Sequence, residues 1–300
     1  NDYCKETFGE KVYRLSLNGG MTCPNRDGSL STRGCAFCSE GGSGDFAAAP
    51  SSSISKQIEE AKKLVDNGVF ELVLLAQDLT NYGKDLYGKP KLVELLKELG
   101  KLDGLKWIRL LYCYPESITD ELIEEIAINE KVCKYIDIPI QHCNDTILKR
   151  MGRRGNKETI ISVINKLREK VPGITIRTTL ITGFPGETDE LFMETYTFLR
   201  DVVRPAFIHI FPYSRRAGTP AASRKDQVQD CVKTKRVQML EALCEELHKE
   251  FIESNNGVAE KVLFESTDKK GMMEGYTGNY IRISRKYDPE LIGKIVDVTI

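Results

Sequence analysis

Residues 174–188 read ITIRTTLITGFPGET, a strand-like run of mostly β-branched residues that ends in a turn containing glycine and proline. A helical pattern with apolar residues at three- and four-residue spacing follows it, and this strand–helix unit recurs along the chain. The strand-like runs are 12–17, 71–76, 107–113, 135–140, 174–182 and 206–213. The helical patterns between them are 53–66, 90–101, 118–129, 157–170 and 188–202. This alternation predicts an α/β fold with a parallel sheet, either open or curled into a partial (β/α)6 TIM-like barrel, whose site lies in the loops after the strands.

The pattern changes toward the end of the chain. A long charged amphipathic helix is predicted at about 226–254, and after residue 257 short strands follow one another with no helix between them. We therefore expect a core over 1–225, a connecting helix over 226–257 and a small all-β domain over 258–300. This last domain is expected to be a barrel-like module of five strands.

Composition narrows the class of protein. The chain has 300 residues, of which 41% are hydrophobic, so it can bury a substantial core. Its net charge of −1 gives no general signature of nucleic-acid binding, and no apolar run is long enough to span a membrane. Nine unevenly spaced cysteines without a signal-peptide pattern indicate a reducing compartment. We expect a cytoplasmic monomer.

Three cysteines stand in one polar, glycine-containing stretch directly after the first predicted strand. Residues 22–39 read TCPNRDGSLSTRGCAFCS and contain Cys23, Cys35 and Cys38. Three thiolates can hold only three irons of a four-iron cubane, so one iron stays open to another ligand. The alternative is a zinc site completed by Cys4 or a histidine. The remaining cysteines are interpreted as buried thiols, with Cys143 as the best candidate for a further role.

These cysteines and the predicted parallel fold resemble the radical S-adenosylmethionine (SAM) superfamily. The resemblance implies a [4Fe-4S] cluster held by Cys23, Cys35 and Cys38, with SAM chelated to the open iron and cleaved to a 5′-deoxyadenosyl radical. It also implies that Phe37 lies beside the adenine of SAM.

The resemblance varies along the chain. Residues from about 1 to 66 resemble YhcC-type radical SAM proteins, which are related to the Elp3-like group. LLAQDLTNYGKDLYG, YIDIPIQHCNDTILKRMGRR and RTTLITGFPGET resemble methylthiotransferases that act on an aspartate of a ribosomal protein. HIFPYSRRAGTPAA and EGYTGNYIRI resemble the branch that modifies threonylcarbamoyladenosine in tRNA, which makes the tail a TRAM-like domain. Because the resemblance changes from one stretch of the chain to the next, we hypothesise that the chain is a mosaic of these families.

The sequence departs from the methylthiotransferase pattern in two ways that bear on the reaction. Methylthiotransferases separate these cysteines by three and then two residues, whereas the first gap here is wider, between Cys23 and Cys35. They also carry a preceding domain with three further cysteines, for which we expect no room before Val12. The resemblance implies a methylthiotransferase-like enzyme that acts on tRNA or a ribosomal component and receives electrons from flavodoxin or ferredoxin. Two alternatives remain: another RNA-directed radical SAM reaction, or a non-catalytic RNA-binding module stabilised by zinc or a cluster. The sequence does not identify the source of sulfur.

The resemblance also assigns residues to the cofactor. Gly183, Pro185 and Gly186 follow the predicted strand 174–182 and would bring backbone close to SAM. The alternative is an ordinary strand-to-helix turn in which Glu187 or Thr188 caps the next helix. By the same analogy, three further polar residues would face SAM: Gln77, Gln141 and Arg177. The Arg177 guanidinium is suited to the carboxylate of SAM.

Basic and aromatic residues are the candidates for substrate contact. Arg215 and Arg216 lie in the loop after the last predicted strand of the core, so we expect them at the same mouth as the cluster. Tyr276 and Arg282 of the terminal domain could stack on or clamp an RNA strand, or could instead dock that domain on the core. A further basic cluster at 149–154 could meet phosphates or be a solvated helix face.

Overall fold

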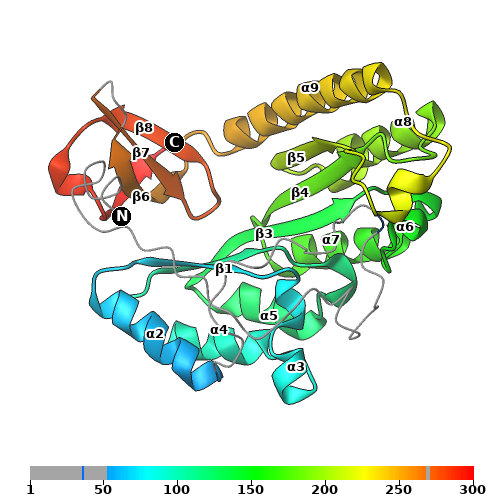
Figure 1. The fold of residues 1–300 in the computed structure, drawn as a ribbon. Helices are drawn as coiled ribbons and strands as arrows, with labels where there is room; N and C mark the ends of the chain where they lie inside the picture. Colours follow the sequence, from blue (N-terminus) through cyan, green and yellow to red (C-terminus); the bar gives the residue numbers. More distant parts are fainter. Residues whose placement is uncertain (1–35, 37–52, 268–270) are drawn as a thin grey trace.

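The protein, here a computed structural model, is described at residue 36 and over 53–267 and 271–300. Its main sheet has five parallel strands in the order β1-β2-β3-β4-β5 (Figure 1). The strands are β1 (Glu71–Leu75), β2 (Trp107–Leu111), β3 (Val132–Gln141), β4 (Thr175–Thr182) and β5 (Phe207–Pro212). These five confirm the predicted α/β class. The other predicted strand, 12–17, lies outside the described residues.

Helices connect and cover these strands. They are α2 (Ile54–Asp66), α3 (Lys84–Tyr87), α4 (Leu92–Gly100), α5 (Asp120–Ile128), α6 (Asp145–Met151), α7 (Lys157–Lys170), α8 (Asp189–Phe198) and α9 (Asp230–Ser254). The short 3₁₀ helices are η1 (Leu79–Asn81), η2 (Pro115–Ser117), η4 (Pro220–Ser223) and η5 (Pro289–Leu291), and η3 (Leu199–Val203) is a short π-helix directly after α8. Side chains of Thr119, Asn144, Asn156 and Thr188 cap α5, α6, α7 and α8 and fix where they start. No helix in the described ranges is long and apolar enough to cross a membrane.

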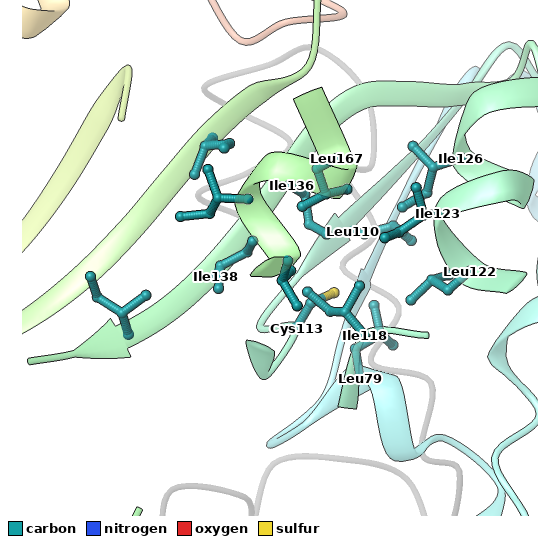
Figure 2. Close-up of a cluster of buried hydrophobic side chains, with 14 of the residues drawn as sticks. Leu79, Leu110, Cys113, Ile118, Leu122, Ile123, Ile126, Ile136, Ile138 and Leu167 are labelled. Atoms are coloured by element: carbon teal, nitrogen blue, oxygen red, sulfur yellow. The ribbon is translucent and has the colours of Figure 1, made fainter. Parts of the chain in front are cut away.

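The core lies between one face of the sheet and these helices. Alternate residues of a strand point to opposite faces, so Ile136 and Ile138 of β3 face the helices together with Leu110 of β2. There they meet Ile123 of α5 and Leu167 of α7 (Figure 2). Burying this apolar surface contributes the main stabilisation of the domain. We call the opposite face the open face; it includes Arg109, Tyr135, Asp137, Arg177 and His209.

The second sheet is antiparallel, with strands in the order β8-β7-β6-β9. Its strands are β6 (Ala259–Thr267), β7 (Met272–Thr277), β8 (Arg282–Lys286) and β9 (Ile295–Thr299). This is a Greek key, because the last strand returns to lie beside the first. The expectation of five strands was wrong for the described part of the domain, which forms these four. Residues 287–294 make a turn around η5, because Pro289 has no N–H to donate to a neighbouring strand.

The second sheet packs against the open face near the starts of the parallel strands. The Tyr280 ring lies 5.1 Å from the Tyr135 ring and 5.9 Å from the ring of Phe207, the first residue of β5. Leu263 of β6 is buried in the same cluster as Trp107, the first residue of β2. The helix α9 runs between the two sheets along the chain and packs on β5 (Figure 1).

Candidate functional site

The ends of β2 and β3 carry backbone conformations that are rare outside glycine. Tyr112, directly after β2, has φ 63°, and Gln141, the last residue of β3, has φ 66°. Such residues cluster at functional sites, since the surrounding structure must hold them in place. Asp137 of β3 helps to do so, because its Oδ2 accepts from the Tyr112 N–H at 3.4 Å and its carbonyl accepts from the Cys113 N–H at 2.8 Å.

A buried polar network joins the loops after β3 and β4. The Glu187 carboxylate accepts from Arg236 of α9 at 2.5 Å, from the Gly183 N–H and from His142 Nε2 at 3.2 Å. The Asn144 N–H donates to His142 Nδ1 at 2.9 Å, so Nε2 carries the imidazole proton. Thr188, and not Glu187, caps α8. The network fixes the turn before α8 to the loop after β3.

The two glycines of this turn are packed against the protein's own side chains. A Cβ on Gly183, at φ +73°, would lie 2.4 Å from Lys233 Cγ, and one on Gly186, at φ +86°, would lie 2.2 Å from Arg150 Nη1. Both positions favour glycine for their conformation, and Gly183 also for the close approach of α9, whereas the end of the Arg150 side chain near Gly186 can move. Pro185 between them is buried. Contact of Gly183, Pro185 and Gly186 with SAM stays a prediction.

Ala36 is the described residue of the cysteine-containing stretch. Its N–H donates to the Met151 carbonyl at 3.0 Å, and its own carbonyl accepts from the Ala221 N–H at 3.0 Å. It packs against a cluster that includes Phe184 of the glycine turn and Tyr213 after β5. Cys23, Cys35, Phe37 and Cys38 lie outside the described residues. The residue between Cys35 and Phe37 in the sequence therefore docks beside the turn that follows β4.

Polar groups gather on the open face of β3, β4 and β5. Arg177 donates to the Tyr135 hydroxyl at 3.3 Å and to His209 Nε2, while its buried Nε has no hydrogen-bond partner among the described residues. Asp137 lies beside Arg177 in the sheet register, and burial raises the pKa of its carboxyl. Within the same described ranges, Asp137 Oδ1 and Gln141 Oε1 also have no hydrogen-bond partner. Unpaired buried polar atoms are costly and indicate a place for a ligand or water.

The other predicted cofactor and substrate residues are dispersed. Gln77 lies between β1 and η1, at the same end of the sheet as Gln141. Arg215 donates to the Ala222 carbonyl at 2.9 Å, and Arg215 and Arg216 are exposed in the loop after β5. By contrast, Tyr276 stacks on Tyr280 at 5.0 Å, near the opposite ends of the strands.

Two further basic residues have partners within the protein. Arg282 is exposed and lies 3.6 Å from Glu274 of the neighbouring strand β7. Arg153 of the cluster at 149–154 is buried, stacks over the Tyr114 ring at 3.9 Å and donates to the Pro139 carbonyl at 3.0 Å. Arg153 therefore contributes to packing and is not available to a phosphate.

The described cysteines are separate thiols. Cys113, Cys133 and Cys143 are buried, and burial raises the pKa of Cys133 to about 12 and that of Cys143 to about 11. Cys143 Sγ lies 3.3 Å from Thr195 Oγ1. Within the described ranges, His, Cys, Asp and Glu side chains form no group of three that could hold a metal ion. Cys143 is therefore a structural thiol, and the possibility of a further role for it receives no support from its surroundings.

The fold and these loops define an α/β protein of the partial-barrel class with a candidate site at the C-terminal ends of its strands. The chain belongs to the radical SAM superfamily, whose family model matches residues 29–199. It is similar in fold to the radical SAM enzyme coproporphyrinogen III oxidase (HemN) of Escherichia coli, with 17% identity and a TM-score of 0.52 over 71% of this chain and 50% of that chain.

Curated relatives are more similar in sequence. Ribosomal protein uS12 methylthiotransferase RimO of Clostridium perfringens is 47% identical over 247 residues, which cover 82% of this chain and 53% of the relative. The Clostridium tetani protein of the same name is 45% identical over 248 residues, with the same coverage. The chain thus spans about half the length of the curated relatives that it matches.

Proposed function

We propose that this chain is a methylthiotransferase-like radical SAM enzyme that modifies an aspartate of a ribosomal protein. The observation that carries the proposal is the 47% identity to a ribosomal protein uS12 methylthiotransferase over 82% of the chain. Modification of threonylcarbamoyladenosine in tRNA is the competing reaction, because the terminal stretch resembles that branch. The first reaction is preferred, since the relatives named above act on a ribosomal protein.

Cys23, Cys35 and Cys38 would hold the [4Fe-4S] cluster, and SAM would complete its coordination. The described residues fit this assignment. Ala36 is fixed by two backbone hydrogen bonds beside Phe184, and no described residue donates to the buried Gln141 Oε1 at the end of β3. When bound, the two cofactors would supply a carbon radical able to remove hydrogen from an unactivated C–H bond.

The chain's own residues would orient these groups. Arg236, Glu187 and His142 hold the Gly183–Gly186 turn rigidly between α9 and the loop after β3, which lowers the cost of ordering it around a ligand. Gln141 would accept a hydrogen bond from the cofactor, with Gln77 and Phe37 on the same side. Arg215 and Arg216 at the mouth, and Tyr276 and Arg282 in a TRAM-like domain over 258–300, would contact the substrate.

The cellular setting is part of the same proposal. A cytoplasmic monomer would receive electrons from flavodoxin or ferredoxin. The core would span 1–225 and the connecting helix 226–257. The source of sulfur is left to experiment, because the curated relatives extend well beyond the length matched here.

Anaerobic reconstitution tests the proposal. The purified chain should take up about four irons and four sulfides, cleave SAM to 5′-deoxyadenosine with a strong reductant, and methylthiolate a ribosomal protein uS12 substrate when sulfide is supplied. Cys38→Ala should lose both the brown absorbance and the cleavage. Cys231→Ala is the matched control, because Cys231 is an exposed free thiol of α9. Bound zinc without SAM cleavage would refute the enzyme, and turnover only on tRNA would refute the ribosomal substrate.

A further inference from the structure

Arg177 has no ion-pair partner within contact distance among the described residues. Its guanidinium donates to two neutral acceptors, the Tyr135 hydroxyl at 3.3 Å and His209 Nε2. Asp137 attracts the guanidinium through space without a hydrogen bond to it, and the buried Nε of Arg177 has no partner among the described residues. A guanidinium presents five N–H donors, so several remain for a ligand.

His209 supports this geometry as a neutral group. It lies on β5 and directs an imidazole nitrogen toward Arg177 from the neighbouring strand. Burial, and then the charge of Arg177, lower the pKa of His209 below its ordinary value. The imidazole therefore accepts a hydrogen bond without adding a second positive charge, and with Tyr135 it holds the guanidinium in one orientation.

Two acceptors with an oxygen that has no partner among the described residues lie on the neighbouring strand. They are Asp137, which is 4% exposed, and Gln141, which is 6% exposed. Asp137 is directly across from Arg177 in the register of β3 and β4, yet the two do not form an ion pair. The open face thus presents a fixed cation beside a buried carboxyl. A ligand that combines a carboxylate with a nearby N–H donor would satisfy Arg177 and Asp137, and Gln141 stays assigned to the cofactor.

The position of Arg177 favours the substrate over the cofactor as the source of that carboxylate. Arg177, on β4, lies six residues before Gly183, so it is closer to the starts of the strands than the turn proposed to contact SAM. Arg177 instead lies toward the second sheet, because the Tyr135 ring that supports it packs on Tyr280. This role differs from the one that the family resemblance implies for Arg177, which is to bind the carboxylate of SAM.

We propose that Arg177 binds the side-chain carboxylate of a substrate aspartate in a peptide segment, while Asp137 accepts from an N–H group of that segment. This inference rests on the proposed function and adds to it the residues that select an acidic peptide. Tyr135 and His209 are positioning residues, since they act through the guanidinium.

Peptide binding tests the inference separately from catalysis. The full chain, reconstituted with cluster and SAM, is titrated against a dye-labelled peptide that copies the aspartate-containing segment of uS12, and against the same peptide with asparagine. Fluorescence anisotropy should show about tenfold tighter binding of the aspartate peptide, as expected for hydrogen bonds to a charged group. The variant Arg177→Gln should bind both peptides weakly and equally. Arg177→Lys keeps the charge without the planar fork and should recover part of the preference.

Lys166→Gln is the control for net charge, because Lys166 lies on α7 and pairs with Asp120 of α5, on the helical side of the sheet. It should preserve the preference. An aspartate preference that survives in Arg177→Gln overturns the inference, as does loss of SAM affinity with unchanged peptide binding. Binding of neither peptide, but of RNA carrying threonylcarbamoyladenosine, also overturns it. If the unmodified chain does not cleave SAM while the peptide preference is present, the proposed function fails and the inference stands.

Discussion

Arg109 of β2 donates a hydrogen bond to the carbonyl oxygen of Gly278, at 2.8 Å, and so joins the parallel sheet to the second sheet. The same guanidinium donates to the Thr277 carbonyl at 3.2 Å and pairs with Glu71 at 2.5 Å. It lies over the rings of Tyr135 and Tyr280, and only 1% of the residue is exposed. Arg109 is therefore a buried charge whose partners come from both sheets.

Replacement of Arg109 by methionine should loosen the second sheet. The variant leaves the Glu71 carboxylate and two carbonyls without their donor, and breaking a buried ion pair costs about 3–5 kcal/mol. We expect a lower midpoint in urea and faster proteolysis of the segment after α9. The double variant Glu71→Gln, Arg109→Met should recover part of the loss, and Arg282→Met, which removes an exposed arginine, should change little. A loss below about 1 kcal/mol for Arg109→Met would contradict this role.

Gly183, directly after β4, and Gly173, before β4, have nearly equal backbone angles. Comparing alanine variants of the two distinguishes the cost of backbone conformation from the cost of side-chain packing. Gly183 has φ +73° and Gly173 has φ +76°, but a Cβ at Gly183 would meet Lys233 Cγ at 2.4 Å, whereas a Cβ at Gly173 would meet nothing within 4 Å. Gly173→Ala should cost about 1 kcal/mol for its conformation alone. Gly183→Ala should cost a further 1–3 kcal/mol, roughly, because Lys233 must move.

Chemical denaturation of both variants, alongside SAM affinity measured by equilibrium dialysis, checks this expectation. Gly183→Ala should also weaken SAM binding, since the turn would shift, while Gly173→Ala should not. Equal stability losses in the two variants would show that Lys233 yields without cost.

The sequence predicted the parallel strands because their β-branched runs are long and bounded by turns. Its errors have local causes. The start of β3 at Val132 was missed, since the lysine at 134 interrupts the apolar pattern, and α6 was not predicted as a separate helix because it has only seven residues. Pro289, which has no N–H to donate to a neighbouring strand, explains why the second sheet has fewer strands than expected in its described part.

The candidate site was predictable in its position and less so in its contacts. The loops after β3 and β4 were expected at one end of the sheet, which their shared network with Glu187 bears out. Arg236 was not predicted, because an arginine in an amphipathic helix resembles a surface residue and burial depends on tertiary contacts. The partners of Arg177 likewise could not be predicted, since they come from strands that become neighbours only in the folded sheet.

The carboxyl of Asp137 gives a prediction for pH dependence. Burial raises its pKa above the ordinary value of 3.8, so the folded state binds this proton more tightly than the unfolded state. Its contribution to stability is present at low pH and is lost as pH rises through the raised pKa. Asp137→Asn should therefore gain stability relative to the unmodified chain as pH increases, and the difference should level off above that pKa.

Urea unfolding of the two proteins across a pH series measures this difference directly. The comparison cancels the contribution of other groups, including His209, whose lowered pKa acts in the opposite direction as pH falls. A difference that does not depend on pH would mean that the Asp137 carboxyl titrates alike in the folded and unfolded states.

The described cysteines should differ sharply in reactivity. A thiolate is the species that reacts with iodoacetamide, and burial raises the pKa of Cys143 to about 11, that of Cys133 to about 12 and that of Cys113 well above its ordinary value. Cys231 is exposed at the start of α9. At neutral pH the native protein should be alkylated at Cys231, with Cys113, Cys133 and Cys143 protected until it unfolds. Peptide mapping by mass spectrometry, with an unfolded sample as the reference, reads each site separately. Rapid native labelling of Cys143 would show that the loop after β3 opens, and would restore that thiol as a candidate for chemistry at the site.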